Sequence, residues 1–200
     1  MYLYFKSFFD YIFALILFLF IIPILIIVSI LIYIKIGSPI IFCQKRTGLY
    51  GKPFTMYKFR TMLIKHNKKG DLLPDNKRRS KIGDFLRKYS IDELPELINI
   101  LKGEMSFIGP RPLLVDYLPL YNDFQLLRFK TKPGLSGWAQ INGRNSLSWK
   151  EKFKLDVWYV ENKNLLLDLL IILKTIKKII IPSGINTDSN DSMPYFNGDN

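Results

Sequence analysis

The longest apolar stretch of the chain lies close to its N-terminus. The 24 residues from Tyr11 to Ile34 carry no charge, and about 20 apolar residues suffice for a helix to cross a bilayer. Pro23 stands at the midpoint of this stretch, where it removes one helical hydrogen bond. The pattern predicts a membrane helix that kinks or turns back at Pro23. Because proline is common in transmembrane helices, these residues by themselves favour a kinked spanning helix over a re-entrant one.

The apolar stretch ends at Pro39, and two short patterns rich in β-forming residues follow. They cover Ile40–Gln44 and Phe54–Phe59, and turn-forming residues separate them. Such a pair predicts a small β-hairpin around residues 47–53. Residues 67–77 are polar and rich in turn formers, so we expect an exposed loop there.

Helical spacing returns after this loop. Residues 81–89 carry an apolar stripe made of Ile82, Phe85 and Leu86. Ser90 is placed to cap a further helix that runs to Leu101, and Glu93 is the third residue after it. This spacing is that of a capping box, in which both side chains bind free backbone amides at the helix start. Spacing alone therefore favours a structural role for Glu93.

A second apolar segment, Asn164–Ile181, carries three lysines on one flank: Lys174, Lys177 and Lys178. The pattern fits a helix at a membrane interface, with the lysines near the lipid headgroups, as well as a helix in the protein core. From Pro182 onward the chain is polar, which predicts a loose tail.

The net charge of +12 comes from one part of the chain. Residues 35–90 hold 15 Lys and Arg against three Asp, whereas the charges of the remaining residues cancel. A basic segment directly after an apolar one fits an anionic leaflet and marks the cytoplasmic side of a membrane. A solvated basic surface and nucleic-acid binding are alternatives. The neighbouring apolar stretch favours lipid, so no nucleic-acid partner is expected.

Cysteine and histidine each occur once, as Cys43 and His66. A single cysteine excludes an intramolecular disulfide, and the two residues together exclude a Cys/His metal cluster. A Ser/His triad is excluded unless His66 serves it. We expect structural or neutral roles for both residues, in a reducing environment that faces the cytoplasm.

Asp92 and Glu93 are the strongest candidates for chemistry. Adjacent carboxylates repel each other, so basic groups or a divalent cation must compensate if both stay ionised. Three basic residues lie nearby in the sequence: Arg87, Lys88 and Arg111. With the apolar stretch upstream and a glycine- and proline-containing run downstream, the pair indicates phosphate chemistry at a membrane surface.

Six ordered motifs run through most of the chain. They are Tyr57–Met62, Ser90–Leu97, Lys102–Pro112, Lys132–Gly137, Ala139–Asn145 and Leu167–Leu169. As a set they are highly specific, and from Lys6 to about Gly184 the chain resembles the bacterial sugar transferases, or monotopic phosphoglycosyl transferases. It is most similar to the small members, which lack the extra N-terminal transmembrane helices of larger relatives.

This resemblance implies a reaction and its partners. The family transfers a sugar 1-phosphate from a UDP-sugar to a polyprenyl phosphate, usually undecaprenyl phosphate, and releases UMP. The resemblance also implies a Mg²⁺ cofactor and a place on the cytoplasmic face of the bacterial inner membrane, at the first membrane step of glycoconjugate biosynthesis. Which sugar is transferred, and the oligomeric state, stay open.

The resemblance further implies roles for individual residues. Asp92 matches the nucleophile, which forms an acyl phosphate with the sugar phosphate, and it is the expected Mg²⁺ ligand. Glu93 matches the neighbouring carboxylate, a candidate for assisting proton removal from the acceptor. Four basic residues are expected to bind phosphate or to support these carboxylates: Lys58, Arg87, Arg111 and Arg144. Asp168 is expected either to be functional or to pair with an arginine.

The expected fold is α+β, a compact and mostly helical cytoplasmic domain with a small β-hairpin and an N-terminal re-entrant membrane segment. Residues 1–36 are expected to form that segment, broken near Pro23, which reverses the preference for a spanning helix. Residues 37–184 are expected to form the catalytic domain, and residues 185–200 a polar tail.

Two alternatives belong to other functional classes. A non-catalytic, membrane-tethered basic module that binds anionic lipid or nucleic acid explains the charge and the apolar stretch, but not the motif set. A nucleotide-sugar hydrolase that uses the same two carboxylates explains the motifs, and its turnover is independent of polyprenyl phosphate.

Overall fold

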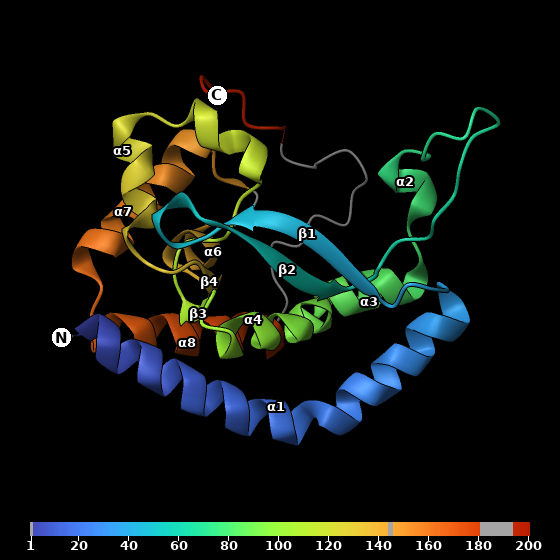
Figure 1. The fold of residues 1–200 in the computed structure, drawn as a ribbon, viewed down its shortest axis with the longest axis horizontal. Helices are drawn as coiled ribbons and strands as arrows, with labels where there is room; N and C mark the ends of the chain where they lie inside the picture. The colour runs from blue at the N-terminus through green and yellow to red at the C-terminus, as the bar shows by residue number, and fades with distance from the viewer. Residues whose placement is uncertain (1, 144–145, 181–193) are drawn as a thin grey trace.

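The computed structural model describes residues 2–143, 146–180 and 194–200. Figure 1 shows a long N-terminal helix, α1, beneath a mostly helical lobe that contains two small sheets. The mostly helical character and the small hairpin are thereby confirmed. In chain order the elements are α1 (Tyr2–Lys35), β1 (Ile41–Thr47), η1 (Leu49–Gly51), β2 (Pro53–Phe59), α2 (Asp75–Arg78), α3 (Lys81–Lys88), η2 (Ile91–Glu96), α4 (Leu97–Leu101), β3 (Ser106–Ile108), η3 (Val115–Leu120), α5 (Asp123–Leu126), η4 (Leu127–Lys130), β4 (Gly134–Ser136), α6 (Trp138–Asn142), α7 (Trp149–Asn162) and α8 (Leu165–Ile180).

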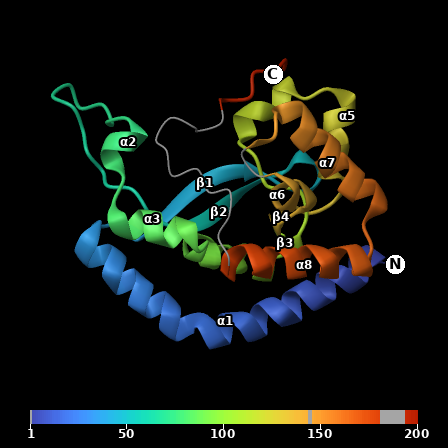
Figure 2. The same cartoon turned by 180° about the vertical axis from the view of Figure 1, so that it is seen from behind.

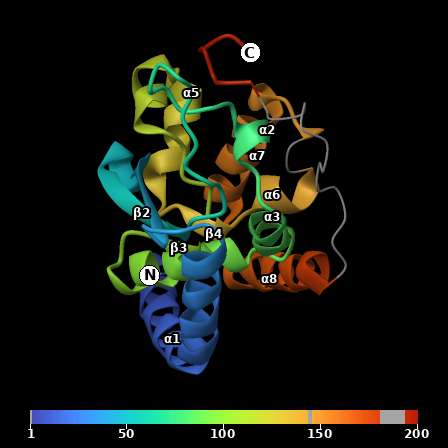
Figure 3. The same ribbon diagram turned by 90° about the vertical axis from the view of Figure 1, so that its right-hand side faces the viewer.

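Helix α1 is continuous but bends near its middle. Both of its ends lie against the lobe, while the bend points away from it (Figures 1 and 3). Pro23 lies inside the helix, and a proline, which has no amide hydrogen to donate, is a common cause of such a bend. The first half of α1 packs on β2 and α4 through Ala14 and Ile21, and the second half packs on β2 and α3 through Val28 and Ile32.

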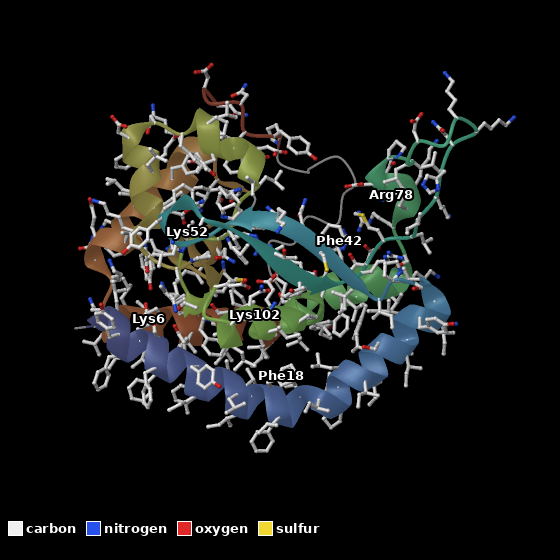
Figure 4. The ribbon with its side chains drawn as sticks, in the orientation of Figure 1. Lys6, Phe18, Phe42, Lys52, Arg78 and Lys102 are labelled. Atoms are coloured by element: carbon white, nitrogen blue, oxygen red, sulfur yellow. The ribbon has the colours of Figure 1, made fainter. Side chains whose placement is uncertain are left out.

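Most of the α1 surface is not covered by the rest of the protein. Its buried residues lie on one face, and they are Asp10, Ala14, Ile21, Val28 and Ile32. Large apolar side chains project outward along the other faces (Figure 4), and Phe20, for example, is 79% exposed. By length and composition alone, α1 is able to cross a membrane. An exposed apolar surface of this extent is typical of a membrane or protein contact.

The hairpin has the predicted place, with a longer first strand. β1 and β2 pair antiparallel, from Ile41 opposite Phe59 to Thr47 opposite Pro53. A second sheet, in which β3 and β4 run parallel, was not predicted. These two strands are short, and Gly134 allows the chains to approach closely, because a Cβ atom there would lie 2.0 Å from the backbone nitrogen of Gly109.

The segment before α4 differs from the predicted capped helix. α3 covers Lys81–Lys88 as expected, but Ser90 has a left-handed φ of 56° and its side chain caps nothing. The 3₁₀ turn η2 follows, and α4 begins only at Leu97. The capping-box prediction is wrong because an N-cap residue needs an extended backbone, and because the Glu93 carboxylate binds basic side chains instead.

The apolar stripe of α3 is buried only in part. Leu86 is 2% exposed, whereas Phe85 is 52% exposed. Phe85 lines a cleft that is described below, so it faces open space rather than the core.

An aromatic cluster forms the core of the part of the lobe that is remote from α1. Its buried members are Tyr117, Tyr121, Phe129, Trp149, Phe153 and Phe196. Phe196 is 3% exposed, and Trp149 Nε1 donates a 2.9 Å hydrogen bond to the carbonyl oxygen of Pro194. The expected loose tail is therefore packed at its described end, because one aromatic side chain completes this cluster. Residues 181–193 lie outside the described part of the chain.

Helix α8 lies along the first half of α1 (Figures 1 and 2). It buries Ile171, but Leu166 is 79% exposed and Leu173 is 66% exposed. One face of the segment, with Ile171 and Leu167, thus belongs to the protein core, while its other faces are uncovered as expected for a helix at a membrane interface. With its apolar side chains uncovered beside α1, α8 extends the apolar surface of that helix.

Asp168 of α8 is a structural residue. It is 5% exposed, and its carboxylate accepts hydrogen bonds from Tyr2 Oη and Lys6 Nζ, at 2.6 Å each, and from Tyr159 Oη at 2.7 Å. The expected arginine partner is thus wrong, since a lysine and two tyrosines take its place. Through these hydrogen bonds, Asp168 connects the first turns of α1 to α7 and α8.

Candidate active site

Asp92 lies in η2. This turn packs against strand β2 of the hairpin and is followed by α4. The residue is 9% exposed. Burial raises the pKa of its carboxyl group, and the adjacent Glu93 raises it further, while Lys58 and Arg111 oppose the rise. Among the described residues, no side chain forms a hydrogen bond or ion pair with the Asp92 carboxylate. It is therefore a buried carboxylate that lacks a direct cationic partner.

Glu93 has a different environment from that of its neighbour. Its Oε1 atom accepts hydrogen bonds from Lys58 Nζ at 2.7 Å and from Arg111 Nη2 at 2.8 Å. Burial by itself would raise the pKa of Glu93, but the two cations outweigh it and lower the pKa to about 2. Glu93 is thus a permanent anion that holds two basic side chains in place.

Glu96 is a third carboxylate of this site, and the sequence patterns did not identify it. It is 3% exposed, and its Oε1 lies 3.0 Å from Lys58 Nζ. Burial raises the pKa of Glu96 to about 7, against the opposing effect of Lys58. The available signal was its spacing, because residues three apart eclipse each other in a 3₁₀ helix, which places Glu93 and Glu96 on the side that faces Lys58.

Arg111 lies in the segment that follows β3. Contacts at Gly109 and at Arg111 itself hold the backbone of this segment in place. A Cβ atom on Gly109 would lie 2.3 Å from the carbonyl oxygen of Lys132, so only glycine fits there. On the other side, Arg128 Nη2 donates a 2.7 Å hydrogen bond to the carbonyl oxygen of Arg111. Arg128 is itself 2% exposed and binds Asp156 at 2.8 Å. A buried ion pair thereby sets the position of Arg111.

Asp92 and Glu93 open into a large cleft with a volume of about 1570 Å³. Lys58, Arg87 and Arg111 also line it, so the structure brings these three predicted phosphate-binding residues to one cavity. Arg87 comes from α3 and forms an ion pair with Asp84 at 3.1 Å. Arg144, the fourth predicted residue, lies outside the described part of the chain.

Of the described carboxylates of the site, Asp92 is the one that fits as a ligand to a magnesium ion. Within the described residues, no group of three or more His, Cys, Asp or Glu side chains is arranged to hold a metal. The Glu93 carboxylate is already bound by two cations. Asp92 has no such partner in the part of the chain that the structure describes. Mg²⁺ is often held by one or two carboxylates, with waters and substrate phosphates as its other ligands. Asp92 therefore fits as a single protein ligand to a phosphate-bound ion.

Comparison with known proteins identifies the family of the chain. The model of a family described as bacterial sugar transferase matches residues 1–182. The chain belongs to the bacterial sugar transferase family. The match includes α1, the hairpin, the site and α8, so family membership covers every element described here except the C-terminal end.

Several relatives show how this family varies in length. An uncharacterized sugar transferase, EpsL, of Bacillus subtilis is 55% identical over 165 residues, which is 82% of each chain. The exopolysaccharide production protein ExoY of Sinorhizobium fredii is 36% identical over 90% of this chain and 87% of its own. The UDP-glucose:undecaprenyl-phosphate glucose-1-phosphate transferase of Escherichia coli is 37% identical over 84% of this chain, but over 39% of its own length. As a member of this family, the protein is an enzyme and not a non-catalytic basic module.

Proposed function

We propose that this enzyme transfers a sugar 1-phosphate from a UDP-sugar to a polyprenyl phosphate such as undecaprenyl phosphate, and releases UMP. The observation that carries the proposal is the environment of the two adjacent carboxylates. Asp92 is buried and makes no ion pair with any described side chain, while Glu93 is bound by Lys58 and Arg111. The name of the Escherichia coli relative supports it, since that protein is a UDP-glucose:undecaprenyl-phosphate glucose-1-phosphate transferase.

In the first step, an Asp92 carboxylate oxygen attacks the phosphorus atom that carries the sugar. A bond forms between this oxygen and phosphorus, the bond from phosphorus to the bridging oxygen breaks, and UMP leaves with the electron pair. The product is an acyl phosphate on Asp92. The carboxylate is a ready nucleophile because burial destabilises its charge. Lys58 and Arg111, which Glu93 holds in the cleft, offer hydrogen bonds to the phosphate oxygens.

In the second step, a phosphate oxygen of the polyprenyl phosphate attacks the same phosphorus atom. The bond to the Asp92 oxygen breaks, and the carboxylate returns to its starting state. Glu93 was expected to assist proton removal from the acceptor. A carboxylate with a pKa of about 2 is a weak base, and the second pKa of a phosphate is about 6, so the acceptor is already largely deprotonated at neutral pH. We therefore assign to Glu93 the anchoring of Lys58 and Arg111.

A magnesium ion bound through Asp92 would neutralise charge on the diphosphate of the donor. The Asp92 side chain is the described carboxylate of the site that fits this role. Its raised pKa is consistent with a residue that acquires a cationic neighbour only when a substrate and its metal bind.

We also propose that α1 is a re-entrant membrane helix, with both ends on the cytoplasmic side of the inner membrane. Its bent shape supports this arrangement, since the ends lie against the lobe and the bend points away from it (Figure 3). The exposed apolar side chains of α1 and α8 would then contact lipid. The cleft reaches both helices through Leu17, Ile172 and Ile176, which provides an apolar path for the polyprenyl chain.

Mass spectrometry of the intact protein tests the mechanism directly. After incubation with donor alone, the wild-type protein should gain the mass of one sugar phosphate and release UMP, whereas the Asp92→Asn variant should do neither because an amide is not an anionic nucleophile. Ordinary turnover by Asp92→Asn would refute the assignment. Dependence of turnover on added polyprenyl phosphate separates the transferase from a nucleotide-sugar hydrolase, which releases UMP continuously without acceptor.

A further inference from the structure

The cleft has a cationic end that contains two residues with no role in the steps above. Arg46 on β1 and Lys152 on α7 line the cleft together with Arg111. They come from segments far apart in the sequence, and tertiary contacts bring both to the loop that carries Arg111.

Arg46 is fastened to this loop by its backbone and by its side chain. Its backbone pairs with Leu114 in an antiparallel bridge. Its guanidinium donates hydrogen bonds to the carbonyl oxygen of Pro112 at 3.4 Å and to Gln44 Oε1 at 2.6 Å. The Nε atom is buried and has no hydrogen-bond partner among the described residues. Arg46 thus has a fixed position and, in the described part of the chain, a donor without a partner.

Lys152 lies in the first turn of α7. It precedes Asp156 by four residues, so the two side chains share one face of the helix. Asp156 binds Arg128, which in turn holds the backbone of Arg111. The Lys152 ammonium lies 5.3 Å from the centre of the Trp149 ring. The α7 face that carries Lys152 is therefore the one that faces the Arg111 loop.

Electrostatics agrees with this convergence of cations. Burial lowers the pKa of Arg46 and of Lys152, and in both cases the positive charge of Arg111 lowers it further. Glu96 opposes this effect on Arg46, and Asp156 opposes it on Lys152. Like charges repel, and an anion bound among them reduces the repulsion. The arrangement is that of an anion site, and in a cleft that receives a nucleotide diphosphate the anion is a phosphate.

The contacts of these cations distinguish the two phosphates of the donor. Glu93, which is next to the nucleophile, accepts a hydrogen bond from Arg111. Arg46 instead binds Pro112 and pairs with Leu114, and Lys152 lies against Trp149. In an in-line displacement the leaving group departs on the side opposite the attacking atom. The phosphate nearest to Arg46 and Lys152 is therefore the one that leaves.

The residues around Arg46 and Lys152 favour binding of a nucleotide there over binding of the membrane-held acceptor. Tyr117, Trp149 and Tyr195 line the cleft here, and Tyr195 is 77% exposed, so its ring is open to stacking by a base. α7 begins in the part of the lobe that is remote from α1 (Figures 1 and 2). The acceptor would instead enter from the α1 and α8 side.

We propose that Arg46 and Lys152 bind the phosphate that leaves with the nucleotide and so form the nucleoside-monophosphate subsite of the cleft. This inference rests on the proposed function, because it assumes a nucleotide sugar as donor.

Calorimetric titration of the full-length protein in detergent with UMP tests the subsite without catalysis. Lys152→Met and Arg46→Met should each raise the Kd for UMP about tenfold to a hundredfold, the usual effect of losing a hydrogen bond to a charged group. Lys154→Met and Lys45→Met are matched controls, because both lysines are exposed neighbours of the tested residues. They should change the Kd by less than about twofold, as surface substitutions commonly do.

Steady-state kinetics then separates the nucleotide from the acceptor. The KM for the UDP-sugar should rise in Lys152→Met, while the KM for polyprenyl phosphate stays constant. An unchanged Kd for UMP in both variants overturns the proposal, and so does a rise in the KM for polyprenyl phosphate in place of the donor. Since Arg46 also supports the Arg111 loop, Lys152→Met decides the outcome if Arg46→Met does not fold. Lys152-dependent binding of UMP by a protein that transfers no sugar phosphate would uphold the subsite and refute the proposed reaction.

Discussion

Arg128 holds the backbone of Arg111 through a 2.7 Å hydrogen bond from Nη2 to the carbonyl oxygen. The guanidinium of Arg128 is itself bound by Asp156 at 2.8 Å, in a pair whose side chains are 2% and 6% exposed. A buried ion pair in the core thus determines where a cleft arginine stands. The site and the core are coupled at this point, so a change in the pair affects both stability and chemistry.

Asp156→Asn should destabilise the protein by about 3–5 kcal/mol, because it leaves the buried charge of Arg128 without its partner. The double substitution Arg128→Met with Asp156→Leu should cost less than the single one, since no buried charge remains. Thermal unfolding in detergent measures both effects. A double variant that is less stable than Asp156→Asn would contradict the interpretation.

Glu93→Gln should slow the first half-reaction as well as the overall transfer. The neutral amide no longer holds Lys58 and Arg111 by charge, so both lose their fixed position beside the donor phosphates. Single-turnover release of UMP with donor alone measures this step. If Glu93 acted only on the acceptor, the burst of UMP in the Glu93→Gln variant would equal that of the wild type.

Arg111→Lys should reduce kcat/KM for the donor by at least about tenfold, because an ammonium group does not reproduce the planar, two-pronged contact of a guanidinium with phosphate. Chelation of divalent cations by EDTA should abolish turnover, and added Mg²⁺ should restore it. Steady-state kinetics checks both expectations. Full activity of the wild type in EDTA would show that the metal assignment is wrong.

Glu96 should make stability depend on pH between about 4.5 and 7. Burial raises its pKa from 4.5 to about 7 in the folded protein, so the folded state binds the proton more tightly than the unfolded state. This contribution is fully present below pH 4.5 and is lost as the pH rises to about 7, by up to roughly 3 kcal/mol.

Glu93 affects stability over a different, more acidic pH range. Its folded pKa of about 2 lies below the ordinary 4.5, so its contribution is present above pH 4.5 and is lost as the pH falls towards 2. Thermal unfolding of Glu96→Gln from pH 4.5 to 7 should therefore lack the decline seen in the wild type. Equal slopes in the two proteins would refute the assignment to Glu96.

Cysteine labelling of intact cells should show that both ends of α1 lie on the cytoplasmic side. Tyr4 is 86% exposed, which makes it a better position for a single cysteine than Tyr2, whose hydroxyl binds Asp168. In a Cys43→Ser background, Tyr4→Cys should be protected from an impermeant maleimide until the membrane is permeabilised. Tyr50→Cys, at the exposed tip of the hairpin, is the cytoplasmic control.

Efficient labelling of Tyr4→Cys without permeabilisation would mean that α1 spans the membrane. Pro23→Ala should shift part of the population towards this state, because alanine restores the missing amide donor and removes the clash of the proline ring. The fraction of Tyr4→Cys protein that is labelled measures the shift.

Local pattern was sufficient for the elements that depend on neighbours in sequence. The apolar run around Pro23 predicted α1, and two runs of β-formers separated by turn residues predicted the hairpin. The apolar stripe of residues 81–89 predicted α3, and the apolar segment with lysines on one flank predicted α8, since each pattern follows from interactions within a few residues. The adjacent carboxylates Asp92 and Glu93 were also visible in the sequence, because their mutual repulsion requires no knowledge of the fold.

Tertiary structure decided what each charged side chain meets. The capping-box spacing of Ser90 and Glu93 gave way to ion pairs with Lys58 and Arg111, and Asp168 found Tyr2, Lys6 and Tyr159 in place of an arginine. No local pattern contains these partners, since they come from segments that meet only when α1, the hairpin and α7 pack together. Burial also follows from packing, and it raises the pKa of both neighbouring carboxyl groups. The direct contacts of Lys58 and Arg111 with Glu93 separate them, because they lower the pKa of Glu93 to about 2 while that of Asp92 stays raised.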